Sequence, residues 1–300
     1  MKKTINFEFY DEIEDSVPTI SSGNELSHIE KFANLIFWID ENKKHIPVKE
    51  LIKREAISEE QDHEFEVFKL LSRAEKNNAT PLFRAGNLPQ SDKRNVLITI
   101  WQGLINKRAK DLNNLPKYHN NVDKNFISEL IKQSRDISLL PSISGYLHSF
   151  GIGLIIEPTL PGLGVDGLVY RDKKGNPIIA LSLRHNRLDN FWFTLAHELS
   201  HVALHYELLE NAIIEDLDQT NTSEIEDEAN YFASESIISS SIWRRCEFRR
   251  KQTDDSLNEL AKNQSIHPIL LAGKLRNETG NYELFSKLVN KYSVREILLG

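Results

Sequence analysis

The stretch NFWFTLAHELSHVALH, residues 190–205, contains His197, Glu198 and His201 in the spacing H-E-x-x-H. Residues four apart in a helix lie on one face, one turn above each other. Both imidazoles can therefore hold one metal ion while the glutamate reaches a water bound to that ion. The flanks are apolar, and no Gly or Pro interrupts residues 191–209. Because unpaired buried polar groups are costly, this polar motif in an apolar helix indicates a metal site and not a surface helix.

The third ligand is expected on the next predicted helix, residues 222–236, because a catalytic zinc site takes three protein ligands and leaves one position for water. Glu226 shares an inward-facing stripe with Asn230 and Ala233, and this phase favours Glu226 as the ligand. The alternative is that Glu226 only closes a capping box with Ser223. Helical phase places the neighbouring glutamates of this helix on other faces.

Other polar residues are candidates for supporting roles. His205 follows His201 by four residues, but three residues on one straight helix cannot easily surround one ion. We therefore expect His205 to contact a ligand or to serve packing, and not to bind metal. The candidates for such supporting contacts, or for stabilising an oxyanion, are His205, Tyr206, Asn230 and His185.

The predicted chemistry is hydrolysis. Zinc lowers the pKa of a bound water and polarises a carbonyl group, and Glu198 can move the proton from that water to the leaving amine. The segment directly before the motif helix is a candidate edge strand, with which an extended substrate peptide could pair. Its residues are Ile178, Ile179, Ala180, Leu181, Ser182 and Leu183.

The pattern of apolar residues predicts an α+β fold. Residues 153–157, 165–170 and 178–183 are predicted strands, with a turn at residues 172–177 between the last two. Residues 26–140 show mainly helical spacing, with a break at residues 77–81. We therefore predict an acidic tail in residues 1–25, a helical N-terminal region in residues 26–140, and a catalytic domain in residues 141–300.

Composition limits the classes of function. The chain has 300 residues and a net charge of −7, which gives no general attraction to phosphate backbones, so direct nucleic-acid binding is not expected. The one concentrated basic run is residues 243–251. No apolar run is long enough to span a bilayer, and the first residues lack the apolar core of a secretory signal. With Cys246 as the single cysteine, we expect a cytoplasmic protein.

Several segments resemble the ImmA/IrrE family of bacterial metallopeptidases. Residues 189–205 are similar to that family's signature helix, and residues 226–233 to a second block whose first glutamate is the third zinc ligand. Residues 165–168 and 265–275 also resemble family segments, and residues 48–57 do so more weakly. Residues 1–46 contain no recognisable helix-turn-helix, unlike family members fused to one.

This resemblance implies a gluzincin-like core, with a small sheet beside the H-E-x-x-H helix, and one Zn²⁺ per chain held by His197, His201 and Glu226. It also implies an endopeptidase that cleaves a protein partner, a helix-turn-helix repressor encoded nearby, and so relieves repression in stress, mobile-element or phage-defence regulation. The alternative is an antirepressor that binds a regulator through a peptidase fold without cutting it.

Overall fold

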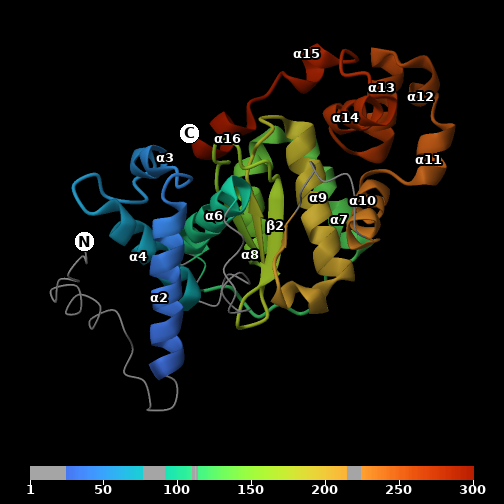
Figure 1. Cartoon of the computed structure of the whole chain (residues 1–300). Helices are drawn as coiled ribbons and strands as arrows, with labels where there is room; N and C mark the ends of the chain where they lie inside the picture. The colour runs from blue at the N-terminus through green and yellow to red at the C-terminus, as the bar shows by residue number, and fades with distance from the viewer. Residues whose placement is uncertain (1–24, 77–91, 110–111, 113, 215–223) are drawn as a thin grey trace.

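The computed structural model describes residues 25–76, 92–109, 112, 114–214 and 224–300. The predicted acidic tail lies almost entirely outside these residues. The described chain is mixed α+β, as predicted, with a small sheet and many helices (Figure 1). The helices before the sheet are α2 (Glu25–Asn42), α3 (Val48–Lys53), α4 (His63–Lys76), α6 (Lys93–Ala109), α7 (Lys124–Lys132), the 3-10 helices η2 (Gln133–Arg135) and η3 (Ile137–Ser142), and α8 (Ile143–His148).

Four strands form one sheet in the order β1-β3-β2-β4. β1 runs parallel to β3, whereas β2 is antiparallel to both β3 and β4. A tight turn connects β2 to β3, in which the Asp172 carboxylate accepts hydrogen bonds from the backbone N–H groups of Lys174 and Asn176, both at 2.8 Å. Gly175 supplies the positive φ of 84° that this turn requires. The strands are β1 (Gly153–Ile156), β2 (Gly167–Arg171), β3 (Pro177–Leu181) and β4 (Ile213–Ile214).

The prediction that Ile178–Leu183 form an edge strand for substrate is wrong. Residues 178–181 lie in β3, which pairs with β1 on one side and β2 on the other. Both sets of its main-chain groups are therefore used within the sheet. Ser182 and Leu183 follow the strand, and the Ser182 side chain donates to the carbonyl oxygen of Val165 at 2.6 Å.

The helices after the sheet begin with α9, which carries the H-E-x-x-H motif. It is followed by a short 3-10 turn, the edge strand β4 and a helical C-terminal region. The elements are α9 (Leu188–Leu204), η4 (Tyr206–Glu210), α10 (Glu224–Ile237), α11 (Ser240–Arg245), α12 (Glu247–Lys251), α13 (Asp254–Gln264), α14 (Pro268–Thr279), α15 (Ser286–Val289) and α16 (Val294–Leu299).

Both faces of the sheet are buried, because successive side chains of a strand point to opposite faces and each face has its own layer of helices. On β3, Ile178 and Ala180 join the hydrophobic cluster of the N-terminal helices, whereas Ile179 and Leu181 join the cluster that contains α9. Figure 1 shows α6 on one side of the sheet and α9 on the other. The N-terminal helices therefore share a core with the sheet, and the boundary predicted near residue 140 stays a prediction.

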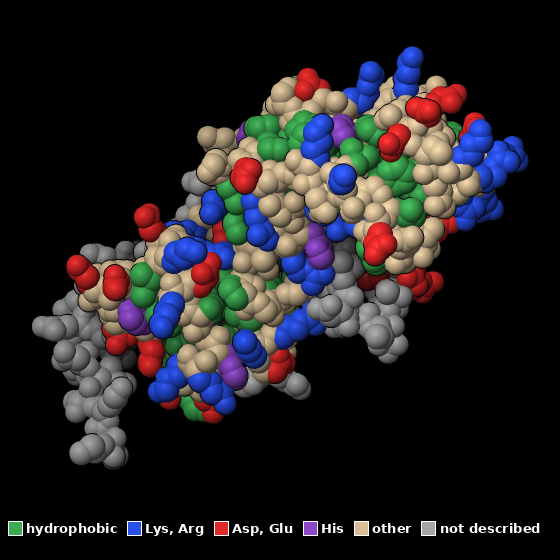
Figure 2. Space-filling view, turned by 90° about the horizontal axis from the view of Figure 1, so that it is seen from above, with side chains coloured by type: hydrophobic (Ala, Val, Ile, Leu, Met, Phe, Trp, Pro, Cys, Tyr) green, Lys and Arg blue, Asp and Glu red, His purple; other side chains and the backbone are tan. Residues whose placement is uncertain are grey.

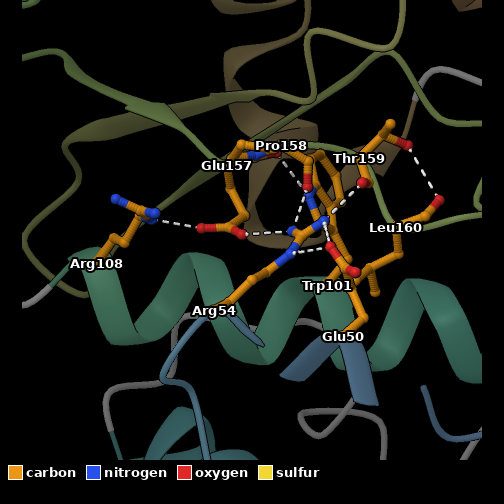
Figure 3. Close-up of polar contacts among 8 residues, drawn as sticks. All are labelled: Glu50, Arg54, Trp101, Arg108, Glu157, Pro158, Thr159 and Leu160. Atoms are coloured by element: carbon orange, nitrogen blue, oxygen red, sulfur yellow. Dashed lines mark hydrogen bonds and ion pairs between the residues drawn. The ribbon is translucent and has the colours of Figure 1, made fainter. Parts of the chain in front are cut away.

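A partly buried arginine connects the N-terminal helices to the loop that follows β1. Arg54, just after α3, donates to the carbonyl oxygens of Pro158 and Thr159 at 2.6 and 2.8 Å. The same guanidinium contacts the carboxylates of Glu50 and Glu157 at 2.8 and 3.0 Å (Figure 3). One planar group thus satisfies four acceptors, which only an arginine fork can do.

Contacts from both Arg54 and α6 converge on Glu157, whose side chain is only 3% exposed. Its second oxygen accepts a hydrogen bond from Arg108, which lies in the last turn of α6. Its backbone oxygen accepts from the indole N–H of Trp101 at 2.9 Å. The end of β1 is therefore held from both α3 and α6 (Figure 3).

In the part of the chain that the structure describes, no helix is both long enough and apolar enough to cross a membrane.

Candidate metal centre

Helix α9 positions the motif deep inside the molecule. It packs against β2 and β3 on one side and against α10 and α14 on the other. His197, Glu198 and His201 are all completely buried. The local sequence explains this placement, because apolar residues flank the motif on every side and nothing breaks the helix.

Helix α10 brings a carboxylate to the two histidines. The Nε2 atoms of His197 and His201 lie 3.0 Å apart. A carboxylate oxygen of Glu226 lies 3.0 Å from the first Nε2 and 3.5 Å from the second. Among the described residues, these three form the one group of His, Cys, Asp and Glu side chains close enough to hold a metal ion together.

The donor set suits zinc in both chemistry and spacing. Zinc binds imidazole nitrogen and carboxylate oxygen at about 2.0–2.2 Å, so two ligands of a tetrahedral site lie about 3.4 Å apart. The observed separations of 3.0, 3.0 and 3.5 Å need only a slight opening to accept one ion. With three protein donors, a fourth position remains for water or substrate.

The second ring nitrogen of His197, Nδ1, makes a hydrogen bond to α10. Its Nδ1 lies 3.0 Å from the side-chain oxygen of Asn230, one turn after Glu226 on α10. An amide oxygen only accepts, so Nδ1 carries the proton and Nε2 presents a lone pair to the centre. Asn230 therefore lies where the sequence analysis expects a supporting contact.

Protonation favours metal binding at both kinds of donor. Burial lowers the pKa of His201 from its ordinary value, so the imidazole is neutral near pH 7. Burial alone would raise the pKa of Glu226, but hydrogen bonds and attraction from His197 and His201 outweigh it and lower this pKa to about 2. A neutral imidazole and an ionised carboxylate are the forms that ligate zinc.

Glu198 lies directly against the first residue of β2. A Cβ atom added to Gly167 would lie only 2.2 Å from a carboxylate oxygen of Glu198 and 3.1 Å from the Thr194 side chain. Only a glycine leaves room for the Glu198 carboxylate in this position. Gly167 lies in the 165–168 segment, but its contact with Glu198 has no signal in the local sequence.

Tyr206 contacts the turn between β2 and β3. Its hydroxyl donates to the backbone oxygen of Gly175 at 2.6 Å, and its ring packs against Tyr118 with centroids 5.4 Å apart. The side chain therefore anchors the turn between β2 and β3. Its predicted role as an oxyanion or ligand contact stays a prediction, because no described contact joins Tyr206 to the metal-binding group.

His185 lies in the loop between β3 and α9. This loop is held at the start of β2, where Arg184 pairs with Asp166 at 3.0 Å, next to Gly167. Burial lowers the pKa of His185, with opposing attraction from Asp166. Its predicted contribution to catalysis stays a prediction, because no described contact joins it to the metal-binding group.

His205 lies where a supporting residue is expected. Its Nδ1 is 3.0 Å from Nδ1 of His201, and its Nε2 is 2.9 Å from a carboxylate oxygen of Glu228. Helical phase separates Glu228 from Glu226, so the local sequence does not predict a role for Glu228 at the site. The signal that could have found it is the imidazole at 205, which needs a partner for its second nitrogen.

A basic cluster lies at the end of the molecule formed by α11 and α12, where Figure 2 shows Lys and Arg side chains gathered. Two of its cations are paired, Arg249 with Glu278 and Lys251 with Glu247. The exposed cations of this cluster are Arg244, Arg245, Arg249, Arg250 and Lys251.

Comparison with known families agrees with the class that the fold and the donor set define, a metallopeptidase-type domain. Residues 149–267 match the model of a peptidase family described as the IrrE N-terminal-like domain. The matched residues are therefore similar to the ImmA/IrrE family domain, and they contain the sheet, α9, α10 and the helices up to α13. No curated protein and no solved structure matches the chain.

Proposed function

We propose that this protein is a zinc-dependent endopeptidase that cleaves a protein substrate. The observation that carries the proposal is the meeting of His197, His201 and Glu226 beside the buried carboxylate of Glu198. The match of residues 149–267 to a peptidase family supports the same reaction class. A core of the gluzincin type, with its third ligand from a second helix, would fit this arrangement.

Each side chain then has a distinct task. His197, His201 and Glu226 would hold the ion, which when bound supplies Lewis acidity toward a substrate carbonyl and a water. Glu198 accepts the proton of the attacking water and delivers it to the leaving amine as the peptide bond breaks. Burial of Glu198 within α9 and against Gly167 fixes the direction from which it acts.

We further propose that the substrate is a helix-turn-helix repressor and that its cleavage in the cytoplasm relieves repression. The resemblance of residues 189–205 and 226–233 to ImmA/IrrE peptidases supports this substrate class. Within the described sheet, a substrate that pairs by its main chain has only β1 and β4 as partners, because β3 is central.

Zinc content tests the proposed site. We expect about one zinc per chain in the wild type and a sharp loss in His201→Ala and Glu226→Ala, because a two-ligand site binds weakly. Elemental mass spectrometry of purified, zinc-reconstituted protein measures this, and circular dichroism checks that the variants fold.

Glu224→Ala is the matched control, because Glu224 is an exposed acid on the same helix. Zinc lost with His201 but kept with Glu226→Ala would leave Glu226 as a helix-capping residue. A wild type that takes up no zinc would remove the proposed function and favour the antirepressor that binds without cutting.

Gly167→Ala tests the placement of Glu198. The new methyl group would overlap the Glu198 carboxylate, so we expect peptide hydrolysis to fall about 10- to 100-fold while zinc content stays unchanged. Steady-state cleavage and zinc content of the same preparation measure both effects.

The control is Gly145→Ala in α8, where an added Cβ meets nothing within 4 Å. It should leave hydrolysis unchanged. Wild-type activity in Gly167→Ala would mean that the carboxylate can move at no cost, so contact with Gly167 would not determine its position.

A further inference from the structure

We infer that Glu228 and His205 form a chain of hydrogen bonds that orients His201 as a metal ligand, which makes both of them positioning residues. The chain runs from the Glu228 carboxylate to Nε2 of His205 at 2.9 Å, and from Nδ1 of His205 to Nδ1 of His201 at 3.0 Å. This inference rests on the zinc site proposed above and adds two residues that do not touch the metal.

Donor and acceptor chemistry determines where each proton lies. The Glu228 carboxylate only accepts, so Nε2 of His205 carries a proton. With this proton on Nε2, Nδ1 of His205 is the acceptor, and it faces Nδ1 of His201. His201 must therefore donate from Nδ1, which leaves the lone pair of its Nε2 for the metal ion.

The backbone explains why His205 can make this contact without joining the ligand set. Helix α9 ends at Leu204, and His205 is its C-cap residue with φ −122° and ψ 23°. The chain leaves the helical path there. The ring of His205 lies beside that of His201, with centroids 5.2 Å apart, and its outer edge faces α10.

The contact between His205 and His201 is more deeply buried than the contact between His205 and Glu228. His201 is completely buried and His205 is only 7% exposed, so without His205 the Nδ1 proton of His201 would lose its partner in the interior. The Glu228 side chain is 56% exposed, so its contribution is partly screened by water. We therefore expect His205 to matter more than Glu228.

Helix α10 thus serves the site at three positions. Helix α10 supplies Glu226 to the metal, Asn230 to the outer nitrogen of His197, and Glu228 to the His205 chain. Each histidine ligand therefore has an acceptor at Nδ1, and both Nε2 atoms present lone pairs to the same point. These outer contacts would hold both rings in the orientation that metal binding requires.

Zinc affinity of folded, full-length protein is the test. We expect His205→Leu to raise the zinc dissociation constant about 10- to 100-fold, the usual effect of losing such an outer contact. His205→Asn should retain most of the affinity, because the Asn side-chain oxygen lies as many bonds from Cα as Nδ1 of histidine. Competition with a chromophoric chelator measures the constants. The visible absorption of the cobalt(II)-substituted protein reports ligand geometry.

The test of Glu228 uses charge-matched variants. Glu228→Gln should weaken zinc binding by less than about tenfold, whereas Asp227→Asn should have no effect. Asp227 is an exposed acid of the same turn, so both variants lose one negative charge from the same helix. Equal weakening in the two would show a general charge effect and would overturn the role of Glu228.

The outcomes separate this inference from the proposed function. A wild type that binds zinc, together with His205→Leu of equal affinity and an unchanged cobalt spectrum, would overturn only the orienting chain. If His205→Leu fails to fold, His205→Asn decides: affinity reduced as far as in a ligand variant would contradict the acceptor role. Absence of zinc binding in the wild type would instead remove the proposed function.

Discussion

Glu198→Gln is expected to lower peptide hydrolysis about 10²- to 10⁴-fold, the range for loss of a general base, while zinc content and fold stay intact. Glutamine has nearly the shape of glutamate, so it can occupy the same buried place beside Gly167. It cannot accept the proton of the attacking water. Cleavage of the candidate repressor by purified protein, with zinc measured in the same sample, gives the result.

The same variant separates an enzyme from a binding protein. If the chain acts by cutting, Glu198→Gln should fail to relieve repression in cells, whereas an antirepressor that only binds would act as before. Glu224→Gln, an exposed glutamate on α10, controls for loss of one negative charge. Hydrolysis at the wild-type rate in Glu198→Gln would show that another group takes the proton.

The parts of the structure that the sequence predicts well depend on local patterns. The spacing of His197 and His201 requires only that residues 190–204 are helical, and no Gly or Pro there opposes it. The turn between β2 and β3 follows from two residues: the Asp172 side chain accepts backbone hydrogen bonds, and Gly175 adopts the positive φ that the turn requires. Helical phase alone places Glu226 and Asn230 on the same stripe.

The parts that the sequence does not predict depend on contacts between distant segments. Because helices cover both faces of the sheet, an edge strand and a central strand would both be apolar. The apolar run 178–183 therefore does not reveal that its strand lies between β1 and β2. The edge strand β4 has only the two residues Ile213 and Ile214, too few for a periodic signal. Glu228 reaches His205 only because α9 ends there, which helical phase does not reveal.

Arg54→Met should lower the free energy of unfolding by about 3 kcal/mol, because it leaves the Glu157 carboxylate buried with one partner fewer. It also removes the donors to the carbonyl oxygens of Pro158 and Thr159. Arg108→Met is the matched comparison, since Arg108 pairs with the same carboxylate but its side chain is 53% exposed. We expect it to cost about 1 kcal/mol or less. Urea unfolding at fixed zinc concentration measures both values.

The shape of the unfolding curve then bears on domain organisation. Ile178 and Ala180 of the central strand pack in one cluster with the N-terminal helices, so the helices and the sheet should unfold together. A single transition shifted by Arg54→Met would mean that residues 26–140 are part of the same cooperative unit as the peptidase domain. Two transitions, with only the less stable one shifted, would support a boundary near residue 140. In that case Arg54 would attach a separate helical domain to the loop after β1.

Equal losses of unfolding free energy in Arg54→Met and Arg108→Met would contradict the argument from burial. Both side chains bind the same carboxylate, and they differ chiefly in exposure and in the carbonyl contacts of Arg54.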